Sequence, residues 1–130
     1  MMPAPMVTNL AKFWMDEIGV THILFFQRTE FDDKDVEEYI KTAQSFSGGK
    51  PSLVLIDYSN ISYLSLGALK RFVSPDLIRL TTAAALVVNS SSPFVAGAIT
   101  FLMTLTKEPF PMKVFTNEKE GMDWLLTFRK

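Results

Sequence analysis

The sequence contains no cysteine, a single histidine and no marked excess of charge of either sign. The absence of cysteine excludes disulfide bonds, thiolate metal sites and thiol nucleophiles. With one histidine, a transition-metal cluster would need an unusual set of carboxylate ligands. The 13 Lys and Arg against 14 Asp and Glu give a net charge of -1, which offers no polycation to release counterions from a phosphate backbone. We therefore expect no metal, no cofactor and no nucleic-acid partner.

The 130 residues, 48% of them hydrophobic and 21% charged, are typical of one folded domain. Residues 1–9 contain two prolines and no positive charge before their few apolar residues, so they lack the pattern of a secretory signal. We expect a loose lead-in over residues 1–9 and a single domain over residues 10–130. With no cysteine and no signal, the expected location is the cytoplasm.

A run without charge extends over residues 80–106 and is long enough to cross a bilayer of roughly 30 Å as a helix. Its middle argues against a membrane span, because Asn89, Ser90, Ser91, Ser92 and Pro93 are polar or break helices. The run instead predicts a buried strand over residues 83–88 and a helix over residues 93–105.

Hydrophobic periodicity predicts alternating strands and helices along the rest of the chain. The expected strands cover residues 10–15, 21–27, 52–57, 83–88 and 112–115, and the expected helices begin near Asp32 or Asp33, Leu66, Pro93 and Asn117. Gly48 and Gly49 are expected to end the first of these helices. Strands that alternate with helices pair in parallel through right-handed crossovers. The sequence therefore predicts an α/β fold with a single mixed sheet of about five strands, an N-terminal antiparallel hairpin plus three parallel strands, flanked by about four helices.

Catalytic patterns are scarce. His22 stands alone and is expected to be a surface or partly packed residue, since neither a nucleophile elbow nor a glycine-rich phosphate loop occurs. An enzyme would have to use His22 with Asp57 or Ser65, and we rank this possibility last. The expectation is a protein that is not an enzyme.

Polar residues follow two of the predicted parallel strands. Asp57 ends one strand before Ser65 and Gly67, which begin a helix, and Ser90, Ser91 and Ser92 follow the next strand. Carboxyl ends of parallel strands and the helix N-termini beside them line one crevice that favours an anion. The same hydroxyls can equally cap helices and form turns. We take these residues as the candidate ligand-binding edge.

The predicted helix over residues 93–105 is apolar on nearly all sides, and Phe94, Ile99 and Leu102 are further candidate binding residues. Such a helix must be covered on both sides. Its cover is either this chain or a second copy, or else a membrane surface or an apolar ligand.

Two blocks of sequence resemble known proteins. Residues 53–61, with Ser65 and Gly67 ahead of a helix, resemble the core of STAS domains, the fold of anti-sigma-factor antagonists. Residues 109–118, together with Trp124 and Leu125, are similar to small SpoIIAA-like bacterial proteins of STAS/Sec14 type that have no assigned function. The resemblance covers roughly residues 10–128 and implies a SpoIIAA-like fold.

The chain departs from the antagonists at one position. Their helix opens with an Asp-Ser-Ser-Gly pattern whose second serine accepts phosphate, whereas this chain has Ser65, Leu66, Gly67 and Ala68. Glycine cannot carry a phosphoryl group, although Ser65 could still be modified or hold an anion. The resemblance therefore implies a non-enzymatic interaction or regulatory domain that forms a homodimer or binds a regulatory protein. Its Sec14-like side implies an alternative, a carrier of lipid-like ligands or a sensor peripheral at the membrane.

Overall fold

The computed structural model describes residues 3–27, 32–61, 66–71, 74–89, 97, 100 and 110–129. The strands form one six-stranded sheet whose order follows the chain. The first, second and third strands pair antiparallel, and the third to sixth strands pair parallel. The α/β mixed sheet is thus confirmed, with one strand more than expected. Its elements are β1 (Met6–Val7), β2 (Ala11–Met15), β3 (Val20–Phe25), α1 (Asp33–Ser47), β4 (Ser52–Asp57), α2 (Leu66–Arg71), α3 (Pro75–Ile78), β5 (Thr81–Val87), β6 (Met112–Phe115) and α5 (Glu118–Leu126).

The additional strand corrects the prediction of a loose lead-in over residues 1–9. Met6 and Val7 pair with Phe13 and Lys12 of β2, and the half-buried Met6 packs against the core. The nearby prolines do not prevent this pairing, because β1 lies at the edge of the sheet, where N–H groups on the outer side need no partner strand.

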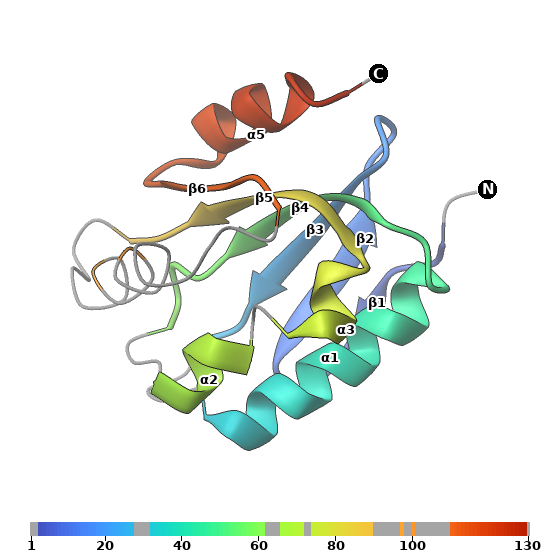
Figure 1. The fold of residues 1–130 in the computed structure, drawn as a ribbon, viewed down its shortest axis with the longest axis vertical. Coiled ribbons are helices and arrows are strands. Elements are labelled where there is room, and N and C mark those ends of the chain that lie inside the picture. The colour runs from blue at the N-terminus through green and yellow to red at the C-terminus, as the bar shows by residue number, and fades with distance from the viewer. Residues whose placement is uncertain are drawn as a thin grey trace.

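The crossovers determine which helices lie on which face. Successive right-handed connections that move in one direction across a sheet place their helices on the same face. Accordingly α1, α2 and α3 lie together on one side of the sheet, and α5 lies on the other side over β4, β5 and β6 (Figure 1). Among the helices that the structure describes, none has the length and apolar character that crossing a bilayer requires.

The register divides the strand side chains into rows that face one layer or the other. One row across the sheet runs through Met6, Phe13, Ile23, Ile56, Leu86 and Val114, and it belongs to the core beneath α1. The opposite face has a smaller core of Val20, Leu55, Ala83, Ala85, Val87 and Leu125. Small side chains on β5 let α5 approach closely, since a Cβ atom on Gly121 would lie 3.4 Å from Cβ of Ala85.

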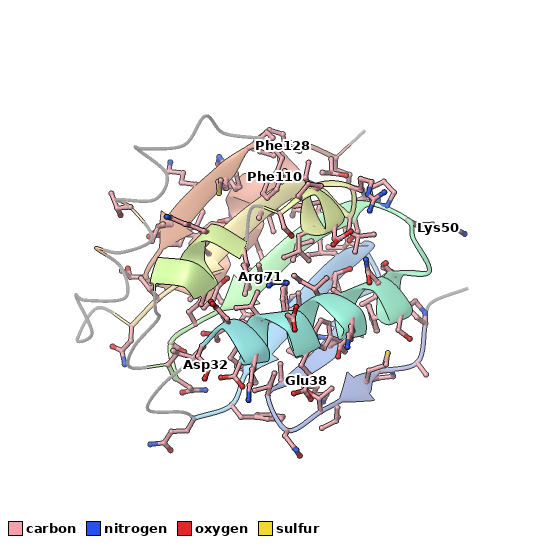
Figure 2. All side chains as sticks on the ribbon, turned by 60° about the horizontal axis from the view of Figure 1, so that its bottom comes forward. Asp32, Glu38, Lys50, Arg71, Phe110 and Phe128 are labelled. Carbon is pink, nitrogen blue, oxygen red and sulfur yellow. The ribbon has the colours of Figure 1, made fainter. Side chains whose placement is uncertain are left out.

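Helix α1 begins and ends as its sequence predicts. The side chain of Asp32 accepts from the backbone N–H of Asp35, and the Asp35 side chain accepts in turn from the N–H of Asp32, which makes a capping box. At the other end, Gly48 has a φ of 61°, a left-handed conformation that glycine adopts without strain. Lys50 follows beyond this end and projects away from the body of the molecule (Figure 2).

Candidate functional site

Asp57 lies at the end of β4, where the sequence predicts a ligand-binding edge. Its carboxylate accepts hydrogen bonds from the turn that follows the strand. Its Oδ1 accepts from the backbone N–H of Ser59 at 2.8 Å and from the Ser59 hydroxyl at 2.6 Å. Asn60 in the same turn donates from Nδ2 to the backbone oxygen of Phe25 at 3.1 Å. Together these bonds join the carboxyl ends of β3 and β4, so the described polar groups here serve a turn.

Gly67 belongs to α2 and lies against α1 rather than against Asp57. A Cβ atom on Gly67 would lie 2.6 Å from Oδ1 and 2.9 Å from Oδ2 of Asp33. An ion pair of 3.2 Å between Arg71 and Glu37 also joins the two helices, and Figure 2 shows Arg71 between them. Asp57 shares its row with Leu24 and Val87 on the α5 side of the sheet. The two described residues of the predicted site are therefore on different sides of the sheet.

The remaining predicted site residues lie outside the part of the chain that the structure describes. They are Ser65, Ser90, Ser91, Ser92, Phe94, Ile99 and Leu102. Their grouping at a ligand-binding edge stays a prediction.

A groove of about 500 Å³ lies at the amino ends of β3 and β4, beside the last residues of α1. Its size is within the usual range of small-molecule sites, about 300 to 1,000 Å³. The wall mixes apolar side chains with hydroxyls. It consists of Pro3, Met15, Gly19, Thr21, Ser45, Phe46, Ser47, Gly48, Lys50, Pro51 and Ser52.

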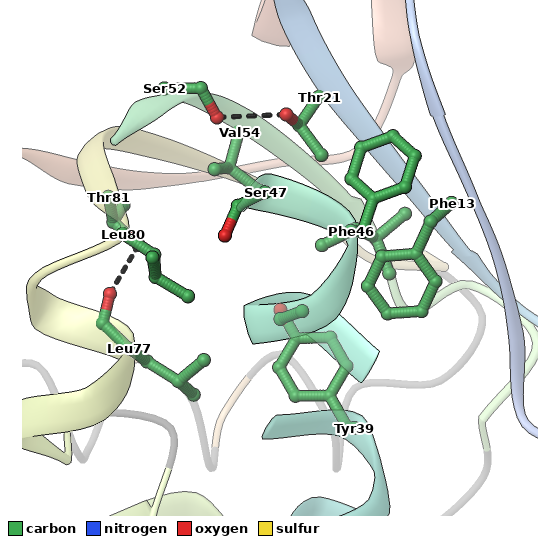
Figure 3. Close-up of a pocket in the computed structure, with 12 residues that line it drawn as sticks. Phe13, Thr21, Tyr39, Phe46, Ser47, Ser52, Val54, Leu77, Leu80 and Thr81 are labelled. Atoms are coloured by element: carbon green, nitrogen blue, oxygen red, sulfur yellow. Dashed lines mark hydrogen bonds between the residues drawn. The ribbon is translucent and has the colours of Figure 1, made fainter. Parts of the chain in front are cut away.

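A cavity of about 30 Å³ adjoins the groove between the sheet, α1 and α3. The hydroxyls of Thr21 and Ser52 are hydrogen-bonded at 2.8 Å on one side of it, and the Thr81 hydroxyl donates to the backbone oxygen of Leu77 at 2.8 Å (Figure 3). The remaining wall is largely aromatic and aliphatic. Because Thr21, Phe46, Ser47 and Ser52 line both hollows, the cavity is an inward extension of the groove.

His22 is buried in the sheet, with only 6% of its surface exposed. Its Nε2 lies 2.8 Å from Oδ2 of Asp16, and its ring stacks on Trp14 with centroids 5.0 Å apart and an interplanar angle of 10°. Its Nδ1 lies 3.7 Å from Oε1 of Glu118 on α5. Three segments thus meet at one imidazole, which the sequence had suggested to be a surface or partly packed residue.

Asp16 binds two things, the turn between β2 and β3 and the ring of His22. Its Oδ1 accepts from the backbone N–H groups of Ile18, Gly19 and Val20 at 2.9 to 3.0 Å. Burial alone raises the pKa of Asp16, but the hydrogen bonds from His22 and the turn outweigh it, and the pKa falls below its ordinary value of 3.8. Asp16 is therefore ionised at neutral pH.

The α5 side of β1, β2 and β3 carries a partly exposed surface, which we term the open half-face. It consists of Val7, Lys12, Trp14 and Leu24. Val7 is 67% exposed, Lys12 is exposed, and Trp14 and Leu24 are half-buried. Nζ of Lys12 lies 5.3 Å from the centroid of the Trp14 ring, within the range of a cation–π contact. Helix α5 covers the other half of this face (Figure 1).

Sequence reasoning found neither the His22 cluster nor the open half-face. One signal was available, because Asp16 and His22 are the acid and the base that flank a predicted hairpin turn. Within the described residues, no group of three or more His, Asp or Glu side chains is arranged to hold a metal ion.

Comparison with known proteins places the chain in a family and a fold. A family model described as "Domain of unknown function (DUF7793)" matches residues 13–129. The structure is similar to the crystal structure of an uncharacterised protein of the DUF3478 family from Shewanella loihica PV-4, which has a SpoIIAA-like fold. That similarity has a TM-score of 0.60 at 19% sequence identity and covers 92% of this chain and 98% of the other. No curated protein matches the chain.

Proposed function

Because the chain belongs to the DUF7793 family of domains of unknown function and has a SpoIIAA-like fold, we propose that it is a non-enzymatic protein-interaction or regulatory domain. The contact between Gly67 and Asp33 carries this proposal. Residue 67, which corresponds to the phosphate-accepting serine of anti-sigma-factor antagonists, lacks a hydroxyl, and a carboxylate fills the space beside it. A phosphate there would also be repelled by Asp33. Partner binding in this proposal therefore proceeds without phosphorylation of residue 67.

The use of the described carboxylates supports a role without catalysis. Asp16 holds a turn and an imidazole, Asp32 and Asp35 cap α1, and Asp57 closes the turn after β4. A general base needs a carboxylate or imidazole that can reach a substrate proton. In this proposal these four groups instead maintain the fold.

A second copy of this chain is the partner that we propose for the open half-face. A twofold contact needs a single patch that is complementary to itself. Lys12 contacts the ring of Trp14 and Glu118 lies beside His22, so the surface around the Trp14–His22 stack carries both a cation and an anion that two copies can pair. The net charge of -1 adds little repulsion between copies.

Sedimentation velocity over a range of concentrations tests this self-association. Four side chains are fewer than the roughly 20 to 30 residues per side of a standard interface, so we expect a weak dimer with a Kd on the order of 10 to 100 μM. Val7→Lys places a charge in the patch and should keep the protein monomeric. The matched control is Ile18→Lys, since Ile18 is also exposed, at 42%, but lies on the β2–β3 turn. A monomeric wild type, or equal dimerisation of the Val7 variant, would contradict the proposal.

Binding of a lipid-like or apolar ligand is the second candidate function, and the groove with its inner cavity supports it. Phe46 and Met15 could contact an apolar chain while the serine hydroxyls bind its polar end. In this role the protein acts in the cytoplasm or at a membrane surface. Calorimetric titration with dodecanoate tests it, using Ser47→Trp to obstruct the groove and Gln44→Trp on the exposed side of α1 as the control. Absence of binding to wild type, or equal binding to the Ser47 variant, would exclude this role for the groove.

A further inference from the structure

His22 has one ring nitrogen without a hydrogen-bond partner. The residue is 94% buried, and among the described residues its Nδ1 is a buried side-chain atom that makes no hydrogen bond. Most buried polar atoms in proteins are hydrogen-bonded, and one that is not carries a free-energy cost. An unpaired nitrogen between two packed elements therefore calls for a physical explanation.

The hydrogen bond to Asp16 determines which nitrogen of the neutral ring carries hydrogen. Asp16 is ionised and accepts at Oδ2 from Nε2, so in neutral His22 the single ring hydrogen is on Nε2. Nδ1 then presents a lone pair toward the carboxylate of Glu118, 3.7 Å away. Two acceptors facing each other do not attract, which leaves α5 without a polar link to β3 at this point.

Protonation reverses that interaction. An imidazolium has an N–H group on both nitrogens, so Nδ1 becomes a donor 3.7 Å from Oε1 of Glu118. The Glu118 side chain is 60% exposed and can move by the fraction of an ångström that separates 3.7 Å from hydrogen-bond length. We propose that protonation of His22 joins the first turn of α5 to the β2–β3 hairpin through a hydrogen bond from Nδ1 to Glu118.

The groups that face His22 come from three segments of the chain. Asp16 faces it from the hairpin turn, Glu118 from α5, and the Trp14 ring from β2. Among the cations on this face, Lys12 has its Nζ 5.3 Å from the centroid of the Trp14 ring. On β4 the register partner of His22 is Leu55, which carries no charge. The contact thus provides a proton-dependent connection between the sheet and α5.

Amide hydrogen exchange measures the connection directly. Leu125 is fully buried on α5 and reports the opening of that helix, while Val36 on α1 serves as an internal reference on the other face. On lowering the pH from about 8 to about 5.5, across the range where histidines titrate, we expect protection at Leu125 relative to Val36 to rise about threefold, as for a partly exposed ion pair.

Two variants separate this contact from general effects of charge. Glu118→Gln removes the anion that accepts from Nδ1 and should abolish the relative change with pH. Glu120→Gln neutralises another exposed acid in the same turn of α5 and should retain it. The proposal is overturned if wild type shows no relative change, if Glu118→Gln retains it, or if both variants lose it.

Discussion

The Asp33 carboxylate of α1 occupies the space in front of Gly67 on α2, so that a Cβ atom at residue 67 would lie 2.6 Å from Oδ1. Cβ atoms in real structures do not approach a neighbour this closely, and any side chain at this position must displace the carboxylate. Glycine at residue 67 therefore leaves room for the exposed Asp33 carboxylate between the two helices.

A double-mutant cycle tests the contact. Gly67→Ala should change the free energy of unfolding little, because moving the exposed Asp33 carboxylate aside offsets the gain in helix propensity. In an Asp33→Ala background the same change should raise stability by about 0.5 to 1 kcal/mol, since alanine has the higher helix propensity. Urea denaturation of the four proteins measures both values. Equal effects of Gly67→Ala in the two backgrounds would show that Asp33 does not restrict residue 67.

The pH dependence of stability should include a contribution from Asp16. Its native pKa is below the ordinary value of 3.8, so its contribution is fully present above that value and is lost as the pH falls through the native pKa. Asp16→Asn should cost about 1 kcal/mol or more at neutral pH through weakened hydrogen bonds, and less at about pH 3. Glu17→Gln, a neighbouring exposed acid, is the control. Urea melts in which the cost of Asp16→Asn is the same at both pH values would contradict this account.

Truncation of Leu125 on α5 should reduce the free energy of unfolding more than truncation of Trp124. Leu125 is fully buried, whereas Trp124 is half-buried and packs at the rim against Phe115 and Phe128. We expect Leu125→Ala to cost about 3 kcal/mol and Trp124→Ala about 1 to 2 kcal/mol. Denaturant titrations of both variants measure the order, and a larger loss for Trp124→Ala would show that the rim contacts hold the helix.

The inner cavity allows a stabilising substitution. Val54 lines it, and Val54→Ile adds one methylene next to this cavity of about 30 Å³. We expect a gain of up to about 0.8 kcal/mol in the free energy of unfolding. Val36 is fully buried away from the cavity lining, so Val36→Ile should instead destabilise by about 1 kcal/mol through overpacking. Chemical denaturation distinguishes the gain in stability from the loss. Destabilisation by Val54→Ile would mean that the cavity cannot accept the methylene.

Much of the fold can be predicted because buried parallel strands are continuous apolar runs and helix ends have local signals. The strands over residues 52–57 and 112–115, and the caps of α1 at Asp32 and Gly48, lie where the sequence predicts them. β1 could not be found this way. Two residues between proline-rich and polar neighbours have no periodicity, and their strand exists only through pairing with β2.

The candidate site could be predicted only in part. The sequence indicates that Asp57 ends a strand and that Gly67 begins a helix, but not that a carboxylate of α1 lies against the glycine. The His22 cluster brings together the β2–β3 turn, a strand interior and the start of α5. Which side chain of each segment faces the imidazole depends on sheet register and on the placement of α5, neither of which is encoded locally.

The most direct test of the central proposal, self-association through the open half-face, is an isotope-filtered nuclear Overhauser experiment on a mixture of labelled and unlabelled protein at dimer-forming concentration. We predict intermolecular contacts between the methyl groups of Val7 and Leu24 in one copy and the indole of Trp14 in the partner copy. Intermolecular contacts confined to α1 or to the outer surface of α5, or none at all, would contradict the proposal.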